Sequence, residues 1–159
     1  MHMSTGSRIA DCLEVTGISL PNATHGEYDR ARAVLNGRVN RKPAFITYPE
    51  NAVHVGELIR LVPAEGLGLS VRGAGHDIHG ESVCVDGIVV DLGSRRLSLY
   101  ETSRTAIAQP GLTLDEFIRA IHKRGFIVPF GSQGTVGLAG FTIGSGTGLL
   151  MSRYKPFFP

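Results

Sequence analysis

The residues best suited to chemistry lie in the segment LSVRGAGHDIHGES, which covers residues 69–82. An apolar strand pattern ends at Arg72, and three glycines, two histidines and small polar residues follow it. Glycines at such a bend leave consecutive backbone N–H groups accessible, and these can bind an anion, especially a diphosphate. Arg72 could add positive charge there, or its side chain could lie on the outer face of a sheet. The neutral imidazole of His76 is also a competent nucleophile near pH 7.

A second glycine-rich segment, FGSQGTVGLAGFTIGSGTGLL, covers residues 130–150. Its hydroxyl groups and accessible amides could bind phosphate oxygens or the polar edge of a ring. Four apolar side chains are expected to pack beneath it: Val136, Leu138, Phe141 and Ile143. The chain has 21 glycines, most of which gather at two places that include these segments, Gly66 to Gly93 and Gly125 to Gly148. Since each segment follows a predicted strand, we expect the two to share one extended ligand.

Other functions fit parts of this pattern. His76, His79 and Cys84 could form a small metal-binding module, although the segment lacks the paired Cys-x-x-Cys that makes a zinc site convincing. A metal site would also leave the second glycine-rich segment without a role. An inert remnant that folds poorly is a third possibility. A Rossmann dinucleotide site is disfavoured, because no helical pattern follows Gly75.

The composition of the chain argues against several classes of function. The chain has 159 residues, 42% of them hydrophobic, which is enough for one globular domain with a sizeable core. Its formal net charge of +2 is spread along the chain, so a nucleic-acid partner is not expected. Two cysteines cannot form a disulfide framework, and neither a signal peptide nor a membrane span is recognisable. We therefore expect a cytoplasmic protein.

Three helices are predicted to position the two segments. The first begins at a capping box of Thr24 and Glu27 and runs through residues 28–36 to a stop at Asn36-Gly37. The second is capped by Asn51 and ended or kinked by Pro63. The third begins at a capping box and ends at Gly125. The residues that define the second and third helices are the stripe Val55, Leu58, Ile59 and Val62, the capping box Thr113 and Glu116, and the stripe Leu114, Phe117, Ile118 and Ile121.

Strand patterns alternate with these helices. The predicted strands are AFITYP from Ala44, Leu69 to Arg72, GIVVDL from Gly87, LSLYE and TAIAQ joined across residues 102–104, and Phe126 to Pro129. The apolar run of GIVVDL is typical of a buried strand. The order of elements predicts a mixed α and β domain without a clean alternation of strand and crossover helix.

These segments together resemble a known family. The run VRGAGHDIHG, followed at the expected separation by GSQGTVGLAG, is similar to the FAD-binding module of the vanillyl-alcohol-oxidase/p-cresol-methylhydroxylase (PCMH) superfamily. The similarity covers about residues 28 to 155 and is strongest to the berberine-bridge-enzyme-like branch. The resemblance implies an α+β fold of the FAD-binding PCMH type, with mixed sheets and flanking helices, and FAD as the cofactor.

The resemblance also implies roles for single residues. In the family, the first loop cradles the FAD diphosphate, and its histidine, here His76, is bonded to a methyl group of the flavin. Gln133 and Gly134 stand where members with two covalent links carry a cysteine, so a single link is expected. The predicted cofactor-binding residues are Arg72, Gly73, Ala74, Gly75, His76, Asp77 and Gly80 in the first loop, and Gly131, Ser132, Thr135, Val136, Gly137 and Gly140 in the second.

The resemblance covers only the N-terminal part of the family's length. It implies an N-terminal extension over residues 1–23, an incomplete FAD-binding domain over residues 24–155, and a missing substrate domain. The family oxidises small organic substrates, and dioxygen is the expected electron acceptor. No catalytic base can be assigned in this sequence, so the shortened chain is expected to be inactive alone. The sequence does not indicate an oligomeric state.

Overall fold

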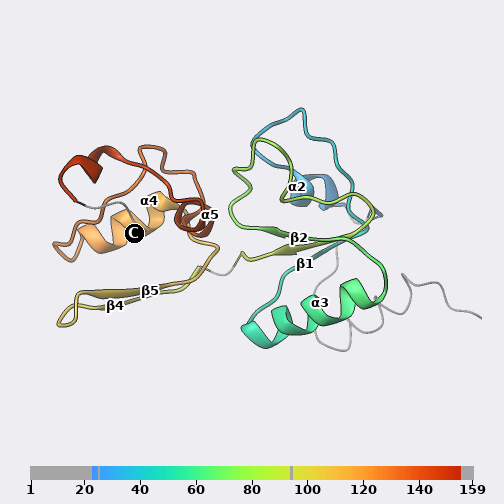
Figure 1. The fold of residues 1–159 in the computed structure, drawn as a ribbon, viewed down its shortest axis with the longest axis horizontal. Helices are drawn as coiled ribbons and strands as arrows, with labels where there is room; N and C mark the ends of the chain where they lie inside the picture. The colour runs from blue at the N-terminus through green and yellow to red at the C-terminus, as the bar shows by residue number, and fades with distance from the viewer. Residues whose placement is uncertain (1–22, 25, 94, 155–159) are drawn as a thin grey trace, which may run out of the picture. The chain divides into compact units, whose positions relative to one another are not determined.

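The computed structural model describes residues 23–24, 26–93 and 95–154, which belong to two compact units (Figure 1). The first unit is Met1–Leu92 and the second is Gly93–Pro159. The predicted N-terminal extension, residues 1–23, lies almost entirely outside the described residues. Within the described ranges, no helix has the length and apolar character needed to cross a membrane.

The first unit is built on a three-stranded parallel sheet. Its strands are β1 (Phe45–Thr47), β2 (Leu69–Arg72) and β3 (Ile88–Asp91), in the order β1-β3-β2. The central strand β3 pairs Ile88 with both Phe45 and Leu69. Because β3 is covered on both faces, its first three residues are buried, as expected for the apolar run of a central parallel strand.

Helices α2 (Tyr28–Arg32) and α3 (Ala52–Ala64) cover opposite faces of this sheet (Figure 1). Successive side chains of β3 alternate between the two faces. Ile88 and Val90 pack with Leu58 and Val62 of α3, whereas Val89 packs with Ile46, Val83 and Tyr28 of α2. As predicted, Asn51 caps α3 by accepting the backbone N–H of His54 at 3.0 Å, and the helix ends one residue after Pro63.

The first helix is shorter than predicted. It ends at Arg32 instead of Asn36, and its N-cap residue, Glu27, makes no side-chain capping hydrogen bond. The Arg32 guanidinium donates to the side chain of Asn40, and the backbone N–H of Leu35 donates to the carbonyl of Gly75 at 2.8 Å. These hydrogen bonds compete with a further helical turn. Because their partners are distant in sequence, local helix signals do not reveal them.

The second unit packs two helices against a β-hairpin. Its elements are the antiparallel strands β4 (Leu97–Tyr100) and β5 (Thr105–Ala108), helices α4 (Leu114–His122) and α5 (Leu138–Ile143), and the 3-10 helix η1 (Leu149–Ser152). The predicted capping box is confirmed, since Thr113 and Glu116 each accept the other's backbone N–H. The core includes Leu112, Leu114, Phe117, Ile121, Phe130 and Leu138.

Two predictions for this unit are wrong. Residues 126–129, all of which the structure describes, form no strand, because no neighbouring strand pairs with them. Phe126 and Val128 instead pack on the α4 core. The second glycine-rich segment contains the helices α5 and η1, and Ile143 is 82% exposed instead of packing beneath the segment. The α+β class is confirmed, and the described residues form one parallel and one antiparallel sheet.

Candidate functional site

The predicted first loop, residues 73–80, leaves the carboxyl end of β2 in the first unit. Gly75 and Gly80 adopt φ values of +71° and +78°, which strongly favour glycine. A Cβ on Gly80 would lie 2.7 Å from Cγ1 of Val39, and one on Gly75 would lie 2.9 Å from Nη2 of Arg72. These glycines are therefore required by the path and packing of the loop itself.

The loop presents a row of backbone N–H groups. Among the described residues, no hydrogen-bond acceptor is found for the backbone N–H of any residue from Gly73 to Asp77. The loop is held through other atoms: the Gly75 carbonyl accepts the Leu35 N–H at 2.8 Å, and the Ile78 carbonyl accepts the Asn36 side-chain amide at 2.8 Å. Consecutive N–H groups at a bend suit the oxygens of an anion, so this stretch fits the predicted diphosphate.

Asp77 organises the far half of the loop. Its carboxylate accepts the backbone N–H of His79 at 2.8 Å and that of Ser82 at 2.7 Å. Burial raises the pKa of the Asp77 carboxyl, but hydrogen bonds from the backbone of Ser82, His79 and Gly80 outweigh burial and hold this pKa below its ordinary value. Both carboxylate oxygens are thus engaged with the loop's own backbone.

The lowered pKa of Asp77 predicts a loop that loosens in acid. A carboxyl whose pKa is lower in the folded state stabilises the fold above its unfolded pKa, about 3.9, and this stabilisation is lost as the pH falls through the folded value. Asp77→Asn should cost about 1 kcal/mol of local stability near neutral pH and remove this acid dependence. Hydrogen-exchange protection of the His79 and Ser82 amides, measured against pH, checks both effects.

Asp86→Asn, at an exposed position, serves as the control for Asp77→Asn. Equal protection of the two amides in both variants would contradict the prediction.

The metal-binding alternative is not supported by the arrangement of side chains. His76 is partly exposed and His79 is exposed. The Cys84 thiol lies 3.4 Å from the carbonyl oxygen of Ile88. Throughout the part of the chain that the structure describes, no three His, Cys, Asp or Glu side chains gather closely enough to hold a metal ion.

Arg72 lies beneath the loop at the carboxyl edge of the sheet. Its guanidinium donates to the carbonyl of Ala31 and lies 3.4 Å from the carboxylate of Asp91. A small cavity of about 230 Å³ adjoins this pair, and Tyr48 also lines it. Asp91 was not predicted as a site residue, although an aspartate at the end of the buried strand in GIVVDL was a usable signal. A direct contact between Arg72 and the cofactor stays a prediction.

The second predicted segment lies in the second unit, and most of its glycines serve packing. A Cβ on Gly131 would lie 2.7 Å from the ring of Phe141, and one on Gly146 would overlap the same ring. A Cβ on Gly148 would overlap the carbonyl oxygen of Phe130. Gly140 differs, because an added Cβ there would meet no atom within 4 Å. Packing within the unit therefore does not require a glycine at position 140, whereas close approach of a ligand would.

The remaining predicted residues of this segment vary in exposure. Ser132 and Thr135 are exposed, and the Thr135 hydroxyl accepts the side-chain amide of Gln133 at 2.9 Å. Val136 packs against the α4 core, and the buried Gly137 precedes α5 as its N-cap. The two exposed hydroxyls are thus accessible, whereas Val136 mainly supports the segment. Whether both segments share one ligand stays a prediction.

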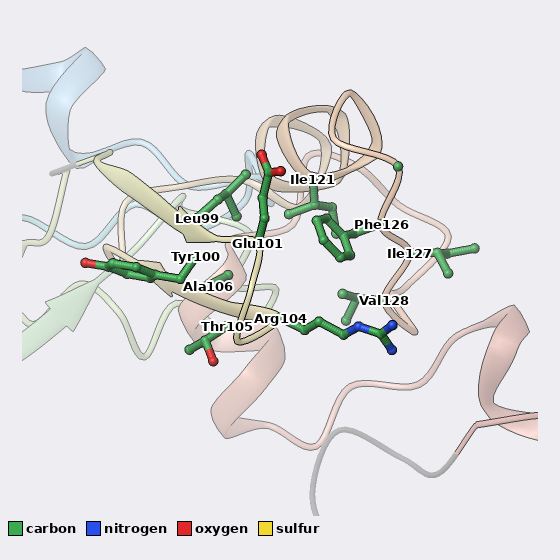
Figure 2. Close-up of a pocket in the computed structure, with 11 residues that line it drawn as sticks. Leu99, Tyr100, Glu101, Arg104, Thr105, Ala106, Ile121, Phe126, Ile127 and Val128 are labelled. Carbon is green, nitrogen blue, oxygen red and sulfur yellow. The ribbon is translucent and has the colours of Figure 1, made fainter.

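A cavity of about 420 Å³ lies elsewhere in the second unit, between the β4–β5 hairpin and the chain after α4 (Figure 2). Leu99, Ile121 and Phe126 give it an apolar lining. Glu101 and Arg104 are the charged residues in its lining, and Glu101 forms an ion pair with Arg124. None of the predicted cofactor-binding residues lines this cavity, and it offers no cluster of groups for acid–base chemistry.

The chain is similar to proteins that bind or are linked to FAD. The sequence profile described as the FAD binding domain matches residues 43–158. The chain is 27% identical over 125 residues to an uncharacterized FAD-linked oxidoreductase, YgaK, of Bacillus subtilis (strain 168), covering 78% of this chain and 28% of that protein. It is 32% identical over 126 residues to tetrahydroberberine oxidase of Argemone mexicana, covering 76% of this chain and 23% of the enzyme.

Solved structures share the fold. The wild-type BBE-like 1 protein of Physcomitrella patens matches with a TM-score of 0.88 and 25% identity, over 94% of this chain and 33% of that one. Glucooligosaccharide oxidase of Acremonium strictum, described with a 6-S-cysteinyl, 8α-N1-histidyl FAD, matches with a TM-score of 0.86 and 20% identity, over 94% of this chain and 32% of the oxidase. The chain thus spans about a third or less of the length of these relatives.

Proposed function

The chain belongs to the FAD binding domain family, and from this membership we propose that residues 73–80 cradle the diphosphate of FAD. The observation that carries the proposal is the row of backbone N–H groups from Gly73 to Asp77, for which the described residues offer no acceptor. They stand at the carboxyl end of a parallel strand, where α/β sheets commonly bind ligands. Asp77 holds the following turn in place.

We further propose that His76 attaches the flavin covalently through a single link. His76 directly follows Gly75 in the loop and is partly exposed, so a ligand held by the loop can reach its ring. The new bond would join an imidazole nitrogen of His76 to the methyl carbon, and the displaced imidazole and methyl hydrogens would leave as protons. The two electrons of the broken methyl C–H bond would reduce the flavin, and an oxidant such as dioxygen would then be needed to remove them. The histidyl FAD of glucooligosaccharide oxidase supports this proposal by likeness.

We base a proposal for the activity of the whole protein on the same family membership. Relatives are named FAD-linked oxidoreductases, and bound FAD supplies two-electron oxidation. We propose a small organic molecule as substrate, dioxygen as electron acceptor and a cytoplasmic location. Because the chain spans about 28% of YgaK and no catalytic base is assigned in its sequence, we expect the 159-residue chain to bind flavin without turning over substrate.

A titration tests the proposed cradle. The 159-residue chain is titrated with FAD and with riboflavin, which has the same ring system but no diphosphate, while flavin fluorescence and absorbance are followed. We expect FAD to bind at least about tenfold more tightly than riboflavin, because only FAD can use the backbone N–H groups. Equal affinity for the two flavins would refute the cradle. Zinc at unit stoichiometry, without flavin absorbance, would favour the metal-binding alternative instead.

A further inference from the structure

We infer that Arg72 is a positioning residue, which supports the bend of the loop from beneath and does not itself bind the diphosphate. Its guanidinium ties the loop to α2 and β3, and so sets where the backbone N–H groups and His76 lie. The expected effect of Arg72 on flavin attachment rests on the proposed function, whereas its expected effect on the position of the loop rests on geometry alone.

Arg72 is anchored at the carboxyl edge of the sheet. It is the last residue of β2 and lies opposite Asp91, the last residue of β3, in parallel register. The side chains are only 14% and 13% exposed, and the Arg72 guanidinium nitrogen Nη1 lies 3.4 Å from the Asp91 carboxylate. The same nitrogen donates to the Ala31 carbonyl at the end of α2. The guanidinium is therefore held by the sheet and by a helix.

Arg72 also lies against the loop. A Cβ on Gly75 would lie 2.9 Å from Nη2 and 3.0 Å from Nε of Arg72, so the guanidinium lies against the Gly75 backbone. On the loop itself, the Gly75 carbonyl accepts the Leu35 N–H at 2.8 Å. The bend that precedes His76 is thus fixed by a packed cation and by a backbone hydrogen bond. Nε of Arg72, which is buried beside Gly75, has no acceptor in the part of the chain that the structure describes.

The chemistry of arginine makes this role specific. A planar guanidinium can donate to Ala31, face Asp91 and cover Gly75 at once, whereas the single ammonium group of lysine cannot do all three. Removing one partner of a largely buried ion pair leaves an uncompensated charge. If the charge of Arg72 bound the diphosphate directly, the variants would behave differently. Arg72→Lys would retain the binding of the diphosphate, and Asp91→Asn would strengthen it by removing a nearby negative charge.

The test compares Arg72→Lys, Arg72→Met and Asp91→Asn with the wild-type 159-residue chain. Arg41→Met is the matched control, because it removes a more exposed arginine that pairs with Glu81 at 2.8 Å in the same unit. After incubation with FAD, the covalently attached and the noncovalently bound flavin are measured separately. We expect all three test variants to lower covalent attachment about tenfold, and the control to leave it unchanged. Attachment that is retained in Arg72→Lys, or increased in Asp91→Asn, would overturn the inference in favour of a direct charge.

A measurement without flavin separates this inference from the proposed function. The Leu35 amide, which donates to the Gly75 carbonyl at 2.8 Å, reports the position of the bend. Its hydrogen exchange should accelerate about tenfold in each test variant and remain unchanged in Arg41→Met. Acceleration at Leu35, with the β3 amides still protected, distinguishes loosening of the loop from unfolding of the unit. Unchanged exchange of the Leu35 amide in Arg72→Met would refute the positioning role. If the wild type takes up no FAD, the proposed function fails, whereas the exchange result still decides the role of Arg72.

Discussion

Replacement of His76 by alanine should abolish covalent flavin attachment and leave noncovalent FAD binding within about threefold of the wild type. Attachment needs a nucleophilic ring nitrogen, and alanine has none. Noncovalent binding depends on backbone N–H groups, which the substitution does not remove. The measurement is the flavin absorbance that stays with the polypeptide after denaturation and extensive washing, compared with the flavin released.

His79→Ala is the matched control for this experiment. His79 lies three residues further along the same loop and is exposed, so its loss should leave attachment unchanged. Flavin that remains attached in His76→Ala would remove the covalent role of His76. Loss of attachment in both variants would instead indicate general damage to the loop, and would equally contradict a specific role for His76.

Replacement of Gly148 by alanine should destabilise the second unit by about 3 kcal/mol or more. The added methyl group would overlap the carbonyl oxygen and carbon of Phe130, and backbone atoms cannot move aside as a flexible side chain can. The backbone of Gly148 is extended, so the cost comes from this overlap and not from a left-handed conformation. Thermal unfolding followed by circular dichroism, together with hydrogen exchange in α4, would report the loss.

Gly140→Ala is the contrasting substitution in the same unit. An alanine here meets no neighbouring atom and lies within α5, so it should raise stability by about 0.5–1 kcal/mol through helix propensity. If Gly140 contacts FAD as predicted, the same substitution should weaken FAD binding. A variant that is more stable and binds FAD normally would remove Gly140 from the predicted site. Equal stability of the Gly148 and Gly140 variants would contradict the packing argument.

Elements with strong local signals could be predicted from the sequence. Strand β2 has the predicted bounds, from Leu69 to Arg72, and the caps at Asn51 and Thr113 form as expected. These features depend on residues within a few positions of one another. The early end of α2 could not be predicted, because it depends on the hydrogen bond between Leu35 and Gly75, which are distant in sequence.

The candidate site was predictable in location but not in its supporting contacts. The glycines of the first loop were interpreted as room for a ligand, yet Gly75 and Gly80 are each closely approached by a side chain of the protein. The burial of Arg72 beside Asp91 required knowing that β2 and β3 are neighbours. Sequence periodicity assigns a residue to a strand, but it does not determine which strands lie side by side.

The strand order of the first unit has a consequence for synthesis on the ribosome. β3 is the last of the three strands to be made, yet it lies between the other two, which do not pair with each other. The nascent chain therefore cannot assemble this sheet until residue 91 has left the exit tunnel, and until then β1 and β2 have unpaired edges. A chaperone that shields exposed strands is most useful to this protein during that interval.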